Sequence, residues 1–200
     1  PPEKIKVSAP DIGGGFGLKN FLFPEWVLLL WASKKLGRPI KWVAERSEDN
    51  SSALHGRDIT TDAKLALDKD GNFLALEADL TANMGAYLSA GGPNASTNAA
   101  STAMGGVYNI PYVFMSSKGV FTNTTPVDAY RGAGKPEANF IIERLIDIAA
   151  SQFNFDPVEL RLKNIISNLP HNTAFGLQID SGKFKENIEK GEYIEHATVH

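Results

Sequence analysis

Two glycine-rich loops hold the residues whose types and spacing could do chemistry. The first is the run GGGFG at residues 13–17, where backbone N–H groups that no side chain shields can converge on an anion. The second is the run DAYRGAGKPE at residues 128–137, where an arginine lies between turn-forming residues directly before a helix. An arginine at this position can donate two parallel hydrogen bonds to an anionic group that the nearby N–H groups also face. Both loops therefore predict contact with an anionic ligand.

Neither loop identifies its ligand by itself. The first loop lacks the glycine-lysine-serine/threonine ending of a phosphate-binding P-loop, because Gly17 is followed by Leu18, Lys19 and Asn20. Leu18 also stands where the dinucleotide-binding fingerprint needs a glycine, so a P-loop or nicotinamide-binding enzyme is disfavoured. A tight turn leading into a helix is an equally good interpretation of the first loop. Arg131 taken alone could be an ordinary surface arginine.

The bulk composition excludes several other kinds of site. The chain has no cysteine, which removes disulfides, thiolate zinc sites, iron–sulfur ligation and cysteine nucleophiles from these 200 residues. Its formal charge of −3, from 20 basic and 23 acidic side chains, offers no basic face to nucleic acid. The longest apolar run, residues 26–32, is far below the roughly 18 residues that suggest a membrane span. The chain opens without a start methionine or a signal peptide, which indicates a piece of a longer protein.

Two smaller clusters have simpler interpretations than metal binding. Asp68, Asp70 and Asn72 resemble the start of a calcium loop, but Gly71 is misplaced, and we predict a hairpin turn instead. His196 and His200 have the spacing of a metal pair on a helix. They lack the glutamate of a zinc protease, so we expect them to be exposed to solvent.

The elements around the loops predict a mixed α+β fold. Pro24 can open a buried helix that carries Trp26 and Leu36 and ends at Gly37. Three further helices are expected: one that begins at Pro136, one that begins at Pro157 behind an Asp156 cap, and one near residues 184–188. Alternation and turn residues predict strands at residues 5–8, 40–45 and 119–122, and a hairpin that joins residues 58–67 to 73–83. Residues 85–108 are expected to be packed loop with room for one helix.

Taken together, the two loops resemble the molybdenum hydroxylases, the family of xanthine dehydrogenase, aldehyde oxidase and carbon monoxide dehydrogenase. The resemblance is to their molybdenum-binding large subunit and rests on residues 13–19 and 129–138 in this order. Supporting segments are YNIP at 108–111, TNT with Pro126 at 122–126, Glu143-Arg144, residues 156–164 and DSG at 180–182. The likeness covers nearly the whole chain and implies an internal fragment. Residues 1–166 would be the C-terminal part of the first molybdopterin-binding domain, and residues 167–200 the start of the second.

The resemblance implies where the cofactor would lie. The implied cofactor-binding residues are Gly14, Gly15, Phe16, Gly17, Arg131 and Gly132. Phe16 and Arg131 would lie beside the molybdenum without being side-chain ligands, because the sulfur atoms of the pterin hold the metal. The implied substrate-facing residues are Asn20, Lys118 and Ala133.

Departures from the family narrow the implied substrate. Asn20, Lys118 and Ala133 stand where the xanthine-oxidising members have glutamate, arginine and phenylalanine, which argues against a purine. Residues 132–134 lack the cysteine of the carbon monoxide enzymes, so a copper-containing cluster is not expected. The implied reaction is oxidation of an aldehyde or heterocycle carbon with water-derived oxygen. The alternative is a non-catalytic structural or assembly module with the same fold.

The family also implies what the parent protein would add. Its catalytic glutamate lies near the end of the large subunit and has no counterpart here, so we expect the parent to be the enzyme and this piece alone to be inactive. The expected cofactor is molybdopterin with molybdenum, either plain or as the cytosine dinucleotide. A 2Fe–2S centre and FAD are expected on partner domains or subunits. We expect an oligomeric parent in the cytoplasm, with the periplasm as the alternative.

Overall fold

The computed structural model describes residues 2–195, which form two compact units divided between Ala53 and Leu54. Each unit contains its own helices. The mixed α+β prediction is confirmed, since helices occur in both units and the second unit contains the sheets. Among the residues that the structure describes, no helix combines the length and apolar character that crossing a membrane requires.

The first unit contains a short 3-10 turn η1 (Pro2–Lys4) and two helices, α1 (Pro24–Leu36) and α2 (Arg46–Ser52). The predicted bounds of α1 are confirmed. Pro24 lies in its first turn, and Gly37 ends it with a left-handed φ of 64° and an N–H bond to the Ser33 carbonyl. α2 begins with a reciprocal cap between Glu45 and Glu48.

The predicted burial of α1 is wrong for the described part of the chain. None of its residues is buried, and the Leu30 and Trp31 side chains are 75% and 58% exposed. A helix that is apolar on several sides is typical of the interior of a larger protein, and the described residues do not cover it. The strands predicted at residues 5–8 and 40–45 are also absent. Neither stretch has a β-partner among residues 2–195, and a strand exists only where a neighbour completes its backbone hydrogen bonds.

The second unit is built on a three-stranded sheet with the order β1-β2-β3. β1 (Ile59–Leu67) and β2 (Phe73–Gly85) form the predicted antiparallel hairpin. The Asp68 carboxylate closes the turn by accepting the N–H groups of Asp70 and Asn72, which confirms a turn there. The Asn72 side-chain amide also donates to this carboxylate. The side-chain bond first, and then the backbone bonds, lower the pKa of Asp68.

β3 (Tyr112–Phe121) runs parallel to β2 and is longer than predicted. The sequence indicated only its end, because the polar run of Ser116, Ser117 and Lys118 hides the alternation. The structure keeps that alternation: Ser116 and Lys118 are exposed, while Met115 is partly buried against the core.

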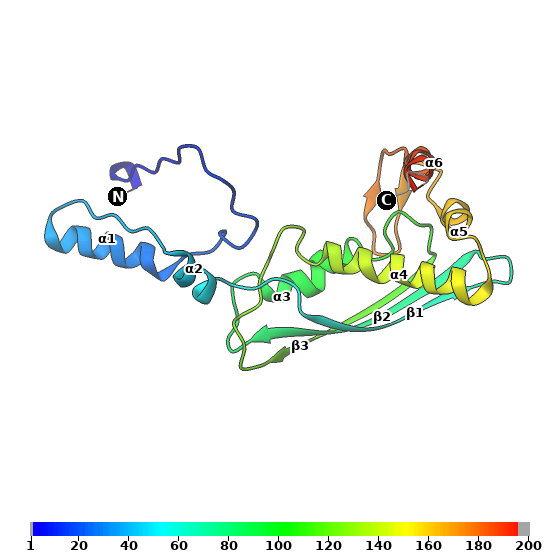
Figure 1. Ribbon diagram of the computed structural model, residues 1–200, viewed down its shortest axis with the longest axis horizontal. Helices are drawn as coiled ribbons and strands as arrows, with labels where there is room; N and C mark the ends of the chain where they lie inside the picture. Colours follow the sequence, from blue (N-terminus) through cyan, green and yellow to red (C-terminus); the bar gives the residue numbers. More distant parts are fainter. Residues whose placement is uncertain (1, 196–200) are drawn as a thin grey trace. The chain divides into compact units, whose positions relative to one another are not determined.

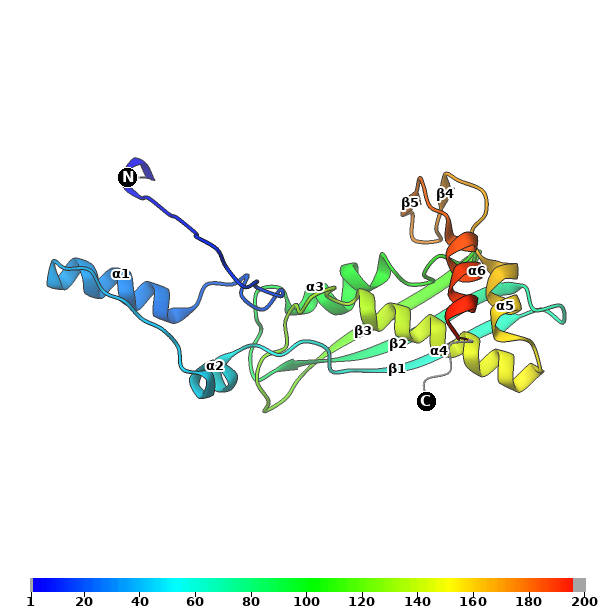
Figure 2. The same ribbon diagram turned by 45° about the horizontal axis from the view of Figure 1, so that its top comes forward.

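Helix α4 (Lys135–Phe153) lies along one face of the sheet in both views of the ribbon (Figures 1 and 2). Its Ile142 and Ile146 are fully buried and share the core with Leu76 and Leu80 of β2. The predicted buried face is confirmed only in part. Of the residues whose spacing predicted it, Ile141 and Ala149 are buried and Leu145 packs against the core, but Phe140 and Ile148 are exposed. α5 (Pro157–Asn164) also begins as predicted, with the Asp156 carboxylate accepting the N–H groups of its first turn.

The remaining elements are short. Residues 85–108 contain α3 (Gly92–Asn94) and a π-helical turn, η2 (Ala95–Ala99). A two-stranded ladder joins β4 (His171–Asn172) to β5 (Gln178–Ile179), and α6 (Phe184–Glu195) extends well beyond the predicted residues 184–188. The predicted exposed pair His196 and His200 lies outside the described residues. The domain boundary between residues 166 and 167 stays a prediction.

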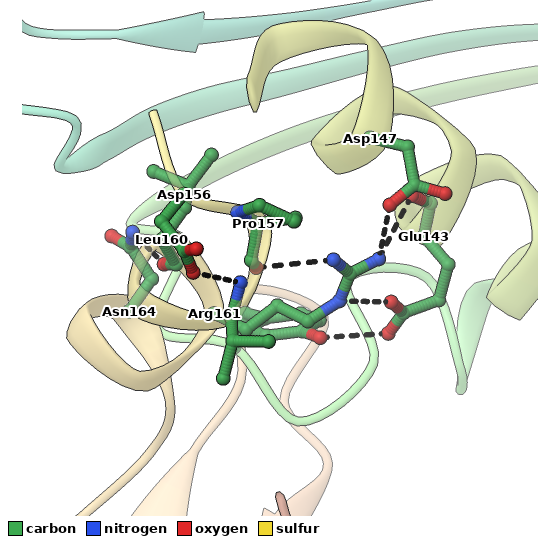
Figure 3. Close-up of polar contacts among 9 residues, drawn as sticks. Glu143, Asp147, Asp156, Pro157, Leu160, Arg161 and Asn164 are labelled. Carbon is green, nitrogen blue, oxygen red and sulfur yellow. Dashed lines mark hydrogen bonds and ion pairs between the residues drawn. The ribbon is translucent and has the colours of Figure 1, made fainter. Parts of the chain in front are cut away.

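A polar cluster fastens α5 to α4 (Figure 3). The Arg161 guanidinium donates to Glu143 at 2.9 Å, to Asp147 at 2.7 Å and to the Pro157 carbonyl at 3.1 Å. Burial lowers the pKa of Arg161, but the hydrogen bonds to Asp147 and Glu143 outweigh it and raise the pKa overall. The Tyr108 hydroxyl donates to the same Glu143 at 2.8 Å, so the cluster also holds the segment before β3.

Candidate functional site

The first glycine-rich loop lies in the first unit and presents unused backbone donors. Phe16 has a left-handed φ of 50°, and its ring lies over Gly14 so closely that a Cβ there would come within 2.9 Å of it. The backbone N–H groups of Gly14, Gly15 and Phe16 have no protein acceptor within residues 2–195. The loop can therefore direct adjacent N–H groups at an acceptor on a bound ligand.

Lys19 anchors the end of this loop within the first unit. Its ammonium forms an ion pair with the Asp49 carboxylate of α2 and lies 5.0 Å from the centre of the Phe23 ring. Its N–H also donates to the Gly15 carbonyl at 3.2 Å. Asn20, which the resemblance implies faces substrate, follows directly and is exposed.

The Arg131 loop lies in the second unit and is a turn of left-handed residues. Gly132, Ala133 and Gly134 have φ angles of 99°, 41° and 82°, and the Ala133 N–H closes the turn by donating to the Tyr130 carbonyl at 2.7 Å. Arg131 and Gly132 are exposed, and within the described residues neither their N–H groups nor the Arg131 guanidinium has a protein partner. The turn therefore offers a positive side chain and two backbone donors to an anion.

One wall of this turn is the segment before η2. Asp128 is 1% exposed. Its carboxylate accepts the N–H of Gly91 at 3.0 Å and also the N–H of Ala129. Gly134 lies against the Ala95 carbonyl so tightly that a Cβ would be 1.8 Å from that oxygen. Only glycine fits at this position, because the space is filled and the φ angle is left-handed.

The other wall is the segment before β1. His55 donates its N–H to the Pro126 carbonyl at 3.2 Å and accepts the Asp128 N–H at 2.7 Å. Gly56 lies directly beside Tyr130, where a Cβ would be 2.4 Å from the Tyr130 Cβ. The chain leading into the turn is thus paired along its backbone, and the turn has little freedom to shift.

Arg57 completes this second wall. Its Nη2 donates to the Arg131 carbonyl at 2.9 Å, and its Nη1 lies 3.4 Å from each of the two Glu137 carboxylate oxygens. The guanidinium carbon is 5.6 Å from the centre of the Tyr130 ring. Sequence reasoning missed Arg57, because its partners are remote in sequence. It included Asp128 in the second loop but gave it no role, because the burial of this acid and its contact with Gly91 depend on packing.

The residues implied to face substrate are not all brought together. Ala133 is half-buried in the Arg131 turn, whereas Lys118 lies on β3 opposite Thr81. Leu80 and Ala82 of β2 face the buried side of the sheet, so Lys118 projects from the other, exposed side. Asn20 and the first loop belong to the other unit.

A groove of about 550 Å³ runs between β1 and α4, beside the Arg131 turn. Most of its lining is apolar, including Ile59, Phe140 and Ile148, and its charged residues are Arg57, Glu137 and Arg144. Among residues 2–195, no three His, Asp or Glu side chains gather where they could hold a metal ion.

Within the described residues, the Arg131 turn thus combines unused backbone donors with an arginine side chain that has no protein partner. Residues 1–165 match the family described as molybdopterin cofactor-binding domain. The carbon monoxide dehydrogenase large chain of Hydrogenophaga pseudoflava is 38% identical over 194 residues, covering 95% of this chain and 24% of its own length. A putative xanthine dehydrogenase molybdenum-binding subunit of Escherichia coli is 33% identical over 95% of this chain and 25% of its own.

A solved structure gives the same result. Quinoline 2-oxidoreductase from Pseudomonas putida 86 matches with a TM-score of 0.86 and 35% identity, over 94% of this chain and 24% of that one. The chain therefore belongs to the molybdopterin-binding large subunits of the molybdenum hydroxylase family, as the two loops indicated. It spans about a quarter of the length of the curated relatives that it matches.

Proposed function

We propose that this chain is part of the large subunit of a molybdenum-dependent oxidoreductase and that its two loops contact the molybdopterin cofactor. The observation that carries the proposal is the Arg131 turn. Its walls hold it in place, while the Arg131 guanidinium and the Arg131 and Gly132 N–H groups have no protein partner in the described part of the chain. Donors held ready in this way are typical of a site for an anionic group.

The proposed roles follow from what each group can donate. Arg131 and the Gly132 N–H would bind anionic atoms of the cofactor near the metal, and the N–H groups of Gly14, Gly15 and Phe16 would face it from the first loop, with Gly17 allowing that loop to turn. When bound, the cofactor would supply the redox chemistry of molybdenum. The protein would orient it, and the exposed Phe16 ring would keep water from one side of the substrate.

For the substrate we propose an aldehyde or a heterocycle. Ala133 has a small apolar side chain and Asn20 an amide, and neither is a residue that would favour a purine. Residues 132–134 contain no cysteine, which disfavours a copper cluster although a carbon monoxide dehydrogenase chain is among the relatives. Other relatives are named for heterocycles, namely quinoline 2-oxidoreductase and the 6-hydroxypseudooxynicotine dehydrogenase complex of Paenarthrobacter nicotinovorans. Lys118 belongs to this proposal on the family resemblance alone.

The rest of the parent protein would supply what this chain lacks. We propose that the general base, a catalytic glutamate, lies outside these 200 residues and that the isolated chain is inactive. The cytosine dinucleotide form of the pterin, the 2Fe–2S and FAD partners, an oligomeric state and a cytoplasmic location are part of the same proposal.

The test is cofactor content in the full-length parent protein. Parent purified from a host that makes molybdopterin should contain molybdenum and pterin in equal amounts, measured by elemental analysis and by fluorescence of the oxidised pterin. A folded parent that contains neither would overturn the proposal and would favour a structural or assembly module. The parent sequence provides an independent check, since an enzyme of this kind needs the downstream glutamate.

A further inference from the structure

We infer that Arg57 is a positioning residue that aims the Gly132 N–H at the cofactor. The inference rests on the proposed function and adds to it a residue outside both glycine-rich loops. Arg57 does not touch the proposed ligand. It acts through the backbone of the Arg131 turn, to which its guanidinium is bound.

The geometry of one peptide group carries the inference. The Arg131 carbonyl and the Gly132 N–H belong to the same planar trans peptide, so they point in opposite directions. Because Arg57 Nη2 holds that carbonyl at 2.9 Å, it also fixes the direction of the Gly132 N–H. Without this bond the peptide could rotate about its flanking dihedral angles, since Gly132 has no side chain to restrict it.

The Arg57 guanidinium is itself fixed by two other contacts. The Glu137 carboxylate lies 3.4 Å from Nη1, and the Glu137 side chain is only 14% exposed. The Tyr130 ring lies 5.6 Å from the guanidinium carbon, within the range of a cation–π contact. The planar fork bonds the carbonyl and the carboxylate through two separate nitrogens while its flat face lies near the ring, an arrangement that the single nitrogen of a lysine does not reproduce.

The backbone at Arg57 is built to make this contact. Arg57 and Asp58 are consecutive non-glycine residues with left-handed φ angles of 75° and 68°. Asp58 is held by Asn83, whose side chain donates to its carboxylate at 2.6 Å and whose N–H donates to its carbonyl at 3.0 Å. Unfavourable backbone conformations of this kind persist where the surroundings enforce them and occur often at ligand sites. Here the conformation turns Arg57 towards the Arg131 loop before β1 begins.

The test uses the full-length parent enzyme with Arg57→Asn. Asparagine tolerates the left-handed region, so this change removes the guanidinium without adding backbone strain, and its short side chain cannot replace the fork. The matched control is Arg144→Gln, which removes an exposed arginine from α4 in the same groove. The measurements are molybdenum and pterin content, thermal unfolding, kcat and KM, and the electron paramagnetic resonance spectrum of the partly reduced enzyme.

We expect folded Arg57→Asn enzyme with kcat lowered about 10–100-fold, a smaller change in KM and an altered resonance spectrum. Folded variant that loads no cofactor would support the inference as well. Arg57→Lys should be impaired too, because the single ammonium nitrogen cannot take the two separate positions of Nη1 and Nη2. The Arg144→Gln enzyme should match the wild type in every measurement.

Three results would overturn the inference. One is a loaded, folded Arg57→Asn enzyme whose kcat and spectrum equal those of Arg144→Gln. Another is full activity of Arg57→Lys. The third is failure of both Arg57 variants to fold, which would make Arg57 purely structural. A wild-type parent without molybdenum would instead overturn the proposed function, so the two failures are distinguishable.

Discussion

The guanidinium of Arg57 donates a 2.9 Å hydrogen bond to the backbone carbonyl of Arg131, 74 residues further along the chain. This bond joins the segment of Arg57 and Asp58, directly before β1, to the turn before α4. The ion pair between Arg57 and Glu137 supports it. The orientation of the proposed cofactor loop therefore depends on a segment that contains no glycine-rich motif. Changes inside the loop and changes in its walls should have different effects, which the following predictions separate.

Arg131→Ala should reduce activity without reducing stability. The Arg131 side chain is exposed. The bond from Arg57 is accepted by the backbone carbonyl of residue 131, which alanine retains. In the parent enzyme we expect kcat to fall about 100-fold or more, because a charged donor aimed at the cofactor is lost. The melting temperature should change by less than about 2 °C. A large drop in melting temperature with unchanged kcat would show that Arg131 is structural.

Gly134→Ala should destabilise the second unit. The new methyl group would lie 1.8 Å from the Ala95 carbonyl oxygen, and the φ of 82° is unfavourable for alanine. We expect a loss of about 3 kcal/mol in the free energy of unfolding, measured by urea titration with far-ultraviolet circular dichroism.

The control for that change is Gly105→Ala. Gly105 has a similar φ of 97°, but its Cβ would meet its nearest neighbour at an ordinary 3.7 Å. The Gly105→Ala variant should lose about 1–2 kcal/mol in the free energy of unfolding, which is the cost of the left-handed φ angle for alanine. Equal losses in the two variants would contradict the close approach of Gly134 to Ala95.

Gly14→Ala should displace the Phe16 ring. The methyl group would come within 2.9 Å of the ring, and the ring can move because it is the far end of a side chain. In the parent enzyme we expect kcat/KM to fall about tenfold if Phe16 borders the substrate. Gly13→Ala adds a methyl group one residue earlier, where nothing lies within 4 Å, and it should have a smaller effect.

Tyr108→Phe should make stability less sensitive to alkaline pH. Burial, and then the hydrogen bond to Glu143, raise the pKa of Tyr108 above its ordinary value of 10.0. The unfolded chain ionises first as the pH rises, so the stabilisation from Tyr108 is complete below about pH 10 and is lost above it. The free energy of unfolding should therefore fall more steeply between about pH 9 and 11 in the wild type than in the variant. Equal slopes would contradict the raised pKa.

Several elements could be predicted because their signals are local. Pro24 with Gly37, and Asp156 with Pro157, restrict the backbone at helix ends, and the Asp68 turn closes within a few residues. The start of α4 follows from one proline, and its apolar spacing predicted part of its buried face. These features depend on neighbours in the chain, so the sequence shows them directly.

Other elements could not be predicted because they depend on distant partners. β3 exists over its full length because β2 pairs with it. Residues 5–8 and 40–45 form no strand because no segment in the described part of the chain pairs with them. α1 has the composition of a buried helix, yet the described residues leave it exposed. Burial depends on what surrounds an element, which its own sequence does not specify.

The sequence by itself determined the family and the two loops. Glycines in a fixed order determine where the backbone can turn, and an arginine beside them places a positive charge there, all within a few residues. Only the tertiary structure decided how the Arg131 loop is held. Its buried acid Asp128, its close contact at Gly134 and its anchor Arg57 all come from residues far apart in the chain. Their roles arise from packing, which brings donors and acceptors together at distances that no local pattern encodes.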